Sequence, residues 1–152
     1  MNRGKALFSA KFKKKKTVMV FGTFDLLHPG HKYLLRQAKK LAPYLIVVIA
    51  RDRTVSTLKG KLPYHDERQR QQAVTSLNLA DQAIFGSLTD KFAAIKKYRP
   101  DIICLGYDQI NFTDQLEQKL KKLNLKTKIV RLKSFKPDKY KTSILKNGKL
   151  KN

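Results

Sequence analysis

Short apolar runs alternate along this chain with stretches in which apolar residues recur every three or four positions. Residues 17–21 and 45–50 are continuous apolar runs, typical of strands covered on both faces. Between them, apolar residues at helical spacing predict a helix over about residues 30–41. The opening of the chain therefore predicts a strand, a helix and a second strand.

The same alternation continues to the carboxyl end. Residues 51–65 are mostly polar and are predicted to form a loop, and Asp66 can cap the helix that follows. The remaining predicted strands cover residues 83–85, 101–105 and 128–132, and the remaining predicted helices cover residues 92–98, residues 116–123 and a short segment from about Lys141. Residues 1–16 show no apolar periodicity.

Strands that alternate with helices favour parallel pairing through right-handed crossovers. We therefore expect an α/β fold with one doubly wound, Rossmann-like sheet of five parallel strands. Ligands of such sheets bind beyond the carboxyl ends of the strands. Residues 22–31, 51–61 and 106–109 each follow a predicted strand, so we expect them to converge on one cleft.

The length and composition fit a single globular domain. The chain has 152 residues, 41% of them hydrophobic, and no apolar run is long enough to cross a bilayer. We expect the domain to span residues 17–146, with basic tails at residues 1–16 and 147–152. Cys104 is the single cysteine, which excludes an internal disulfide and fits a buried thiol and a cytoplasmic location.

The formal charge of +23 is concentrated at the two ends of the chain. Residues 1–16 hold seven of the 34 basic residues and no acid, and residues 119–152 hold thirteen basic residues and one acid. Such asymmetry favours an anionic partner: nucleic acid, nucleotides or phosphorylated substrates. The alternative is a solvated surface that keeps the protein soluble.

The residues with the clearest chemical potential are His28 and His31. They stand at the start of the first predicted helix, where free N–H groups and the helix dipole favour phosphate. Pro29 suits the first turn, and Gly22, with no Cβ, allows backbone to approach a ligand. Three-residue spacing lets both imidazoles face one phosphate chain. The alternatives are surface, capping or metal-ligating histidines, but no His or Cys cluster accompanies them.

Basic and hydroxyl side chains follow later strands. Lys59, Lys61 and Arg70 can offset the charge of a triphosphate, with Arg68 as an alternative to Arg70; lysines of a basic protein can also simply be solvated. Gly106 permits close approach at a strand end, and Asp108 can accept from a base or ribose or form part of a turn. Near the carboxyl end, Thr142 and Ser143 can donate to phosphates or cap a helix.

The segment Gly-Thr-Phe-Asp-Leu-Leu-His-Pro-Gly-His at residues 22–31 resembles the signature of the cytidylyltransferase-like nucleotidyltransferases at every fixed position. The resemblance spans about residues 17–146. It implies transfer of a nucleotidyl group from a nucleoside triphosphate to a phosphate, with Mg²⁺ and release of pyrophosphate; the metal-ligating residues are left unassigned. It further implies catalytic roles for His28, His31, Lys59 and Lys61, and nucleotide binding by Gly22, Thr23, Phe24, Asp25, Arg70, Gly106, Tyr107, Asp108, Lys141, Thr142 and Ser143.

Two motifs resemble one branch of this family, the archaeal-type FAD synthases. These are Gly-Tyr-Asp-Gln at residues 106–109 and Lys-Thr-Ser at residues 141–143. This resemblance implies ATP and FMN as substrates. The enzyme alternative is a cytidylyltransferase that uses CTP and an alcohol phosphate such as glycerol 3-phosphate. The alternative of another class is a nucleic-acid-binding protein, and the basic ends favour nonspecific nucleic-acid contact. Relatives of this kind also suggest a homodimer.

Overall fold

A computed structural model of the chain describes residues 15–106, 109 and 113–133, the side chains of residues 113 and 114 excepted. Within these residues the elements are β1 (Thr17–Gly22), α2 (Pro29–Leu41), β2 (Tyr44–Ile49), α3 (Asp52–Lys59), α4 (Glu67–Ser76), β3 (Gln82–Phe85), α5 (Ala93–Tyr98), β4 (Ile102–Leu105), α6 (Thr113–Lys122) and β5 (Lys128–Arg131). The helix predicted near Lys141 lies outside the described residues.

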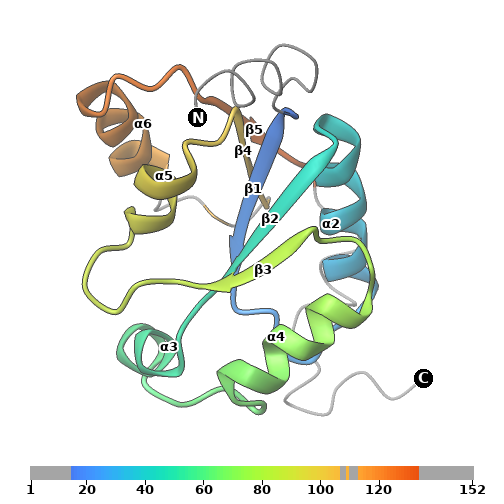
Figure 1. Ribbon diagram of the computed structural model, residues 1–152. Coiled ribbons are helices and arrows are strands. Elements are labelled where there is room, and N and C mark those ends of the chain that lie inside the picture. Colours follow the sequence, from blue (N-terminus) through green and yellow to red (C-terminus); the bar gives the residue numbers. More distant parts are fainter. Residues whose placement is uncertain (1–14, 107–108, 110–112, 134–152) are drawn as a thin grey trace, which may run out of the picture.

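All five strands are parallel, in the order β3-β2-β1-β4-β5, which confirms the predicted sheet. β1 pairs with β2 from Thr17 opposite Tyr44 to Gly22 opposite Ile49. The chain builds outward from β1 in one direction to β3 and then in the other to β5 (Figure 1). The reversal point is therefore between β1 and β4, where a ligand of a doubly wound sheet is expected.

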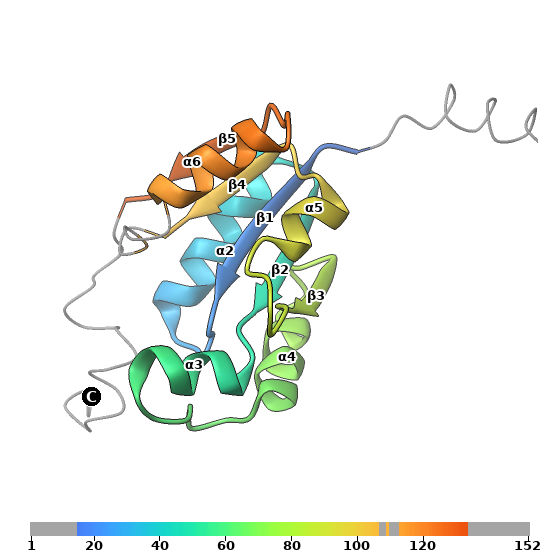
Figure 2. The same ribbon diagram turned by 90° about the vertical axis from the view of Figure 1, so that its left-hand side faces the viewer.

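Helices cover both faces of the sheet (Figures 1 and 2). Successive strand residues point to opposite faces, so Val18 and Val20 of β1 pack with Leu35 of α2 and Val74 of α4. Met19, between them in sequence, packs on the other face with helices α5 and α6. Both faces are apolar, which explains why β1 and β2 are continuous apolar runs rather than alternating ones.

The prediction of a loop over residues 51–65 is wrong for its first part, because Asp52–Lys59 forms α3. Val55 is its one buried residue, too little for an apolar periodicity in the sequence. A residue outside the helix caps its amino end: the Asp52 backbone N–H donates to Glu67 Oε1 over 2.9 Å. It ends at Gly60, whose φ of 76° is a left-handed conformation that glycine adopts without strain.

Two other local predictions are confirmed. Asp66 caps α4: its side chain accepts from the Gln69 backbone N–H over 2.8 Å, and the Gln69 side chain accepts from the Asp66 N–H over 3.0 Å. Cys104 is fully buried in β4, and burial raises the pKa of its thiol to about 11, so it stays protonated at neutral pH. Among the helices described, none has the length and apolar character to cross a membrane.

Candidate active site

The carboxyl ends of the central strands lie side by side and are joined by hydrogen bonds. Ala50 N–H donates to Gly22 O over 2.9 Å, which joins the end of β2 to the end of β1. Gln109 Nε2 donates to Phe21 O over 2.9 Å, which brings the segment after β4 to the same place. The structure thus brings together the segments after β1 and β4, and α3 lies at this end of the sheet (Figure 2).

The loop after β1 has an unusual backbone. Phe24 and Leu26 have φ values of 57° and 52°, in the left-handed region that bulky residues avoid. This conformation turns the Phe24 ring back over Gly22, and a Cβ on Gly22 would meet a Phe24 ring carbon at 2.8 Å. The space beside Gly22, interpreted from the sequence as open to a ligand, is filled by the Phe24 ring. Backbone strain of this kind is concentrated at functional sites.

The loop ends in a capping arrangement made by the two histidines. His28 is the N-cap of α2, and its Nδ1 accepts from Gly30 N–H over 3.0 Å. His31 Nδ1 accepts from His28 N–H over 3.3 Å. The ring centroids are 3.9 Å apart with an interplanar angle of 31°. Capping and ligand binding were alternatives in the sequence; here the Nδ1 atom of each ring performs the capping, and the predicted contact with a phosphate stays a prediction.

This arrangement decides which nitrogen carries the proton. A nitrogen that accepts a hydrogen bond cannot bear a proton, so each neutral ring carries its proton on Nε2. Burial lowers the pKa of His28, and burial together with the His28 charge lowers the pKa of His31 to about 3. Both rings are therefore neutral at pH 7. Each presents an Nε2–H donor of the kind that stabilises charge on phosphate oxygens.

Asp25 supports the loop through its carboxylate. It is 2% exposed and accepts from Tyr64 N–H over 2.7 Å and His65 N–H over 3.1 Å. The segment before α4 is thereby tied to the loop after β1. The structure therefore shows Asp25 in a positioning role. Its contact with a nucleotide stays a prediction.

Arg70, which the sequence predicts to hold phosphates, is held by protein contacts in the structure. Its side chain is fully buried, and it donates to Thr23 O over 2.7 Å, His65 O over 3.0 Å and Asp52 Oδ1 over 2.7 Å. Each of the three guanidinium nitrogens thus donates to a protein oxygen. Its geometry is that of a positioning residue. Arg68, the alternative, is exposed.

Asp52 and Glu67 are site residues that the sequence did not reveal. Asp52 Oδ2 accepts from Glu67 N–H over 3.2 Å while Glu67 accepts from Asp52 N–H, so each acid caps the helix of the other. Arg51 Nε reaches Glu67 over 2.9 Å. The acid at the start of α4 was visible in the sequence, but the pairing of two helix starts is set by the tertiary structure.

The two predicted lysines lie at the carboxyl end of α3. Lys59 is in its last turn and Lys61 follows Gly60, and both are exposed. The positive charge of Lys59 contributes to the lowered pKa of His31, so the ammonium group is within electrostatic reach of the histidines. At the other side, Gly106 N–H donates to Gln109 Oε1 over 2.7 Å. The predicted residues Tyr107, Asp108, Lys141, Thr142 and Ser143 lie outside the described residues.

Comparison with known proteins agrees with this geometry. The model of the family described as cytidylyltransferase-like matches residues 19–148. This chain belongs to that family. It is 46% identical over 118 residues to an FAD synthase of Aciduliprofundum boonei, covering 78% of each chain, and 43% identical to an FAD synthase of Picrophilus torridus, covering 78% of this chain and 84% of the relative.

A solved structure agrees as well. The lipopolysaccharide core biosynthesis protein from Thermoplasma volcanium superposes with a TM-score of 0.75 at 40% identity, covering 80% of this chain and 99% of the other. Family membership and the FAD synthase relatives identify the chain as a nucleotidyltransferase of the FAD synthase type, as the two motifs predicted.

Proposed function

We propose that this protein transfers AMP from ATP to FMN, giving FAD and pyrophosphate. The observation that carries the proposal is the pair of neutral, adjacent histidines whose Nδ1 atoms cap α2 at the carboxyl end of the central strand. The choice of ATP and FMN as substrates rests on relatives named FAD synthase, which are 43–46% identical to this chain over most of its length.

The reaction needs no covalent enzyme intermediate. A phosphate oxygen of FMN attacks the α-phosphorus of ATP, a new P–O bond forms, and the bond to the bridging oxygen breaks as pyrophosphate leaves with its electron pair. The Nε2–H groups of His28 and His31, with the amino end of α2, stabilise the negative charge that develops on the α-phosphate and the leaving group. Lys59 and Lys61 offset the charge of the departing pyrophosphate.

A divalent ion would enter with the substrate. The described residues hold no group of three or more His, Cys, Asp or Glu side chains able to bind a metal, and both Asp25 oxygens accept from backbone N–H groups. Mg²⁺ favours phosphate oxygens and water over an all-protein site. The residues therefore fit MgATP as the substrate, and Mg²⁺ would supply charge neutralisation on the phosphates.

The proposal also covers the cellular location and the oligomeric state of the protein. A lone thiol that is buried and protonated suits a reducing compartment, so we place the reaction in the cytoplasm. A homodimer remains a prediction from resemblance to relatives.

One assay decides among the substrate pairs. Purified protein with Mg²⁺ is incubated with ATP or CTP and with FMN or glycerol 3-phosphate, and pyrophosphate and the nucleotide product are quantified. We expect FAD from ATP and FMN and little product from the other pairs. A CDP-alcohol formed from CTP would instead identify the cytidylyltransferase alternative, and no pyrophosphate with any pair would overturn the proposed chemistry.

A further inference from the structure

Gln109 follows β4 and makes hydrogen bonds to the ends of two strands at once. Its side-chain Nε2 donates to Phe21 O of β1 over 2.9 Å, and its Oε1 accepts from Gly106 N–H, directly after β4, over 2.7 Å. We propose that Gln109 is a positioning residue, which keeps the part of the site that takes the nucleoside in register with the part that takes the phosphates. This inference rests on the proposed use of ATP.

The Gln109 side chain lies where the pairing of β1 with β4 has ended. Within the described residues, that pairing stops at Met19 opposite Ile103, whereas the pairing of β1 with β2 continues to Gly22 opposite Ile49. Gln109 therefore joins the two strand ends beyond their last paired residues. This is the reversal point of the sheet, where ligands of doubly wound folds bind.

The direction of the Phe21 carbonyl group agrees with this position. Gly22 O accepts from Ala50 N–H, so it points toward β2. Successive carbonyl groups of a strand point to opposite edges, so Phe21 O points toward β4. The Gln109 amide thus takes the position that a backbone N–H of β4 would have in a longer ladder, and it sets the distance between the two strand ends.

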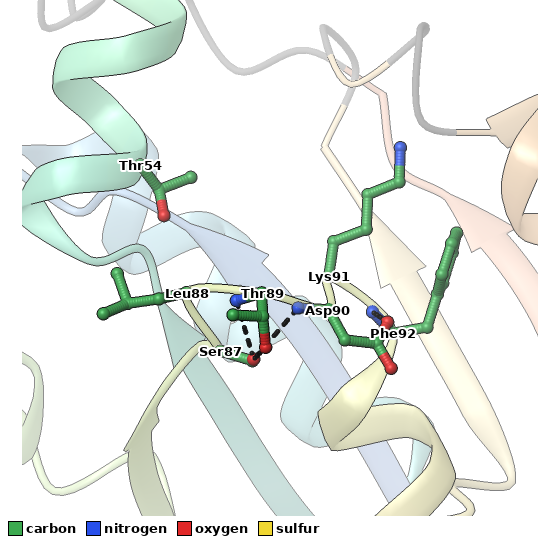
Figure 3. A pocket seen from close by; sticks show the side chains of 7 residues that line it. All are labelled: Thr54, Ser87, Leu88, Thr89, Asp90, Lys91 and Phe92. Carbon is green, nitrogen blue, oxygen red and sulfur yellow. Dashed lines mark hydrogen bonds between the residues drawn. The ribbon is translucent and has the colours of Figure 1, made fainter.

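The two sides of β1 differ at this edge of the sheet. Beyond β2 and β3 there is a hollow lined by Thr54 and residues 87–92 (Figure 3). On the β4 side, the partly buried Gln109 side chain connects the strand ends instead. Gln109 is not part of the lining of the hollow, so we expect its effect to be confined to a ligand on the β4 side.

The residue after β4 is held on both sides of its backbone. Gly106 N–H donates to the Gln109 side chain, and Gly106 O accepts from Gln109 N–H over 3.2 Å and from Arg131 Nη1 over 3.1 Å. Tyr107 and Asp108, which the family motif implicates in nucleotide binding, stand between Gly106 and Gln109 in the sequence. The two ends of this segment are therefore bonded to each other and, through Gln109, to β1.

The same strand leads into the loop that carries the histidines. Phe21, which accepts from Gln109, immediately precedes Gly22, the first residue of the signature that ends at His31. A nucleotide must reach from the segment after β4 to the histidines, so the spacing of these two segments decides whether its base and its phosphates bind together. Loss of the Gln109 bonds should weaken binding of a whole nucleotide and leave binding of phosphates alone unchanged.

The test compares a whole nucleotide with its phosphates. Gln109→Met keeps the length of the side chain and removes both of its hydrogen bonds. Gln71→Met is the matched control, because Gln71 Nε2 also donates to a strand carbonyl, Ala83 O, over 2.7 Å, but in the edge strand β3. Calorimetric titration with Mg²⁺ uses α,β-methylene-ATP and inorganic tripolyphosphate as ligands.

Gln109→Met should raise the Kd for α,β-methylene-ATP on the order of tenfold, with the Kd for tripolyphosphate unchanged. Gln71→Met should leave both constants unchanged. In steady-state kinetics, Gln109→Met should raise the KM for MgATP by a similar factor and change kcat by less than about threefold, as expected when binding common to the ground state and the transition state is lost. A purely structural role would lower the unfolding temperature without separating these constants.

A variant at the surface covers the case in which Gln109→Met does not fold. Arg131 is exposed, and Arg131→Met removes its bond to Gly106 O. Lys128→Met removes the same charge at the other end of β5 and is its control. Arg131→Met should raise the Kd for α,β-methylene-ATP about threefold with the Kd for tripolyphosphate unchanged, and Lys128→Met should change neither.

The outcomes separate this inference from the proposed function. In a folded Gln109→Met, equal changes in the Kd for both ligands, or no change in either, overturn the positioning role; if that variant is unfolded, Arg131→Met decides by the same criteria. Such a result with FAD still formed leaves the proposed function intact. An original protein that binds α,β-methylene-ATP through Gln109 as expected, but forms no FAD from ATP and FMN, contradicts the proposed function alone.

Discussion

At the scale of single residues, the two histidines illustrate how one side chain can serve structure and chemistry. Each uses Nδ1 to satisfy a backbone N–H at the start of α2, which otherwise would have no partner. That use fixes the proton on Nε2 and the orientation of the ring. Preorganised donors cost no rearrangement when charge develops, which is the physical reason for expecting a large catalytic contribution.

His31→Ala should therefore lower kcat by about 10²–10³ while changing the KM for ATP little. Steady-state kinetics with FMN saturating measures both constants. Circular dichroism of the variant serves as the control, since the lost cap could weaken α2. A variant that is folded and keeps near-normal turnover would contradict the assignment.

The lowered pKa of His31 also predicts a pH dependence of stability. Between pH 6.5 and about 3 the unfolded chain binds a proton at this position and the folded protein does not, so lowering the pH favours unfolding. The contribution of His31 to the free energy of unfolding is therefore fully present above pH 6.5 and decreases as the pH is lowered. The slope from this group is up to about 1.4 kcal/mol per pH unit.

His31→Gln removes that slope and no other ionisable group. Urea unfolding of both proteins at pH 7, 6, 5 and 4.5 should give a stability difference that narrows or reverses toward acid pH. Parallel curves for the two proteins would show that His31 keeps an ordinary pKa.

At the scale of elements, α3 and α4 are joined through their amino ends by Asp52 and Glu67, and Arg70 connects this junction to Thr23 in the histidine loop. Neither helix is strongly apolar, so polar contacts rather than core packing hold α3 in place. The position of Lys59 relative to His31 depends on that junction.

Arg70→Met should lower the free energy of unfolding by about 3 kcal/mol, because it leaves the carbonyls of Thr23 and His65 and the carboxylate of Asp52 without this donor. Arg68→Met, two residues away and exposed, should change it by less than about 0.5 kcal/mol. Equal effects in chemical denaturation would contradict the structural role of Arg70.

The end of α3 carries a separate prediction. Lys59→Gln and Lys61→Gln remove positive charge at the carboxyl end of α3 and should each raise the KM for MgATP several-fold. Added salt should weaken the effect of the lysines in the original protein. Lys40→Gln, at the exposed end of α2, is the control. Unchanged kinetics in both α3 variants would make these lysines ordinary surface charges.

At the scale of the whole molecule, the net charge of +23 exceeds what binding one triphosphate requires. We predict weak, sequence-independent association with polyanions. Affinity for a labelled RNA, measured by fluorescence anisotropy, should fall steeply between 50 and 200 mM salt, as expected for counterion release. Binding that is absent at low salt would show that the excess lysines are only a solvated surface.

The sequence by itself determined the strands, their order of appearance and the edge of the sheet at which the predicted site residues lie. Buried parallel strands such as β1 must be apolar on both faces, so a continuous apolar run is enough to predict them. The signature after β1 is contiguous in sequence, so it too can be recognised without the tertiary structure. It did not reveal α3, because one buried valine leaves no periodic pattern and the helix start is capped by Glu67, fifteen residues away.

Only the tertiary structure decided what several site residues do. Arg70 reads as a phosphate ligand in sequence, yet it is buried among carbonyls that belong to two separate loops. Gly22 reads as an opening for a ligand, yet the ring of Phe24 fills that space. The difference has one physical cause: chemical type is a property of a residue, whereas its partners are set by segments that are distant in sequence and meet only in the folded chain.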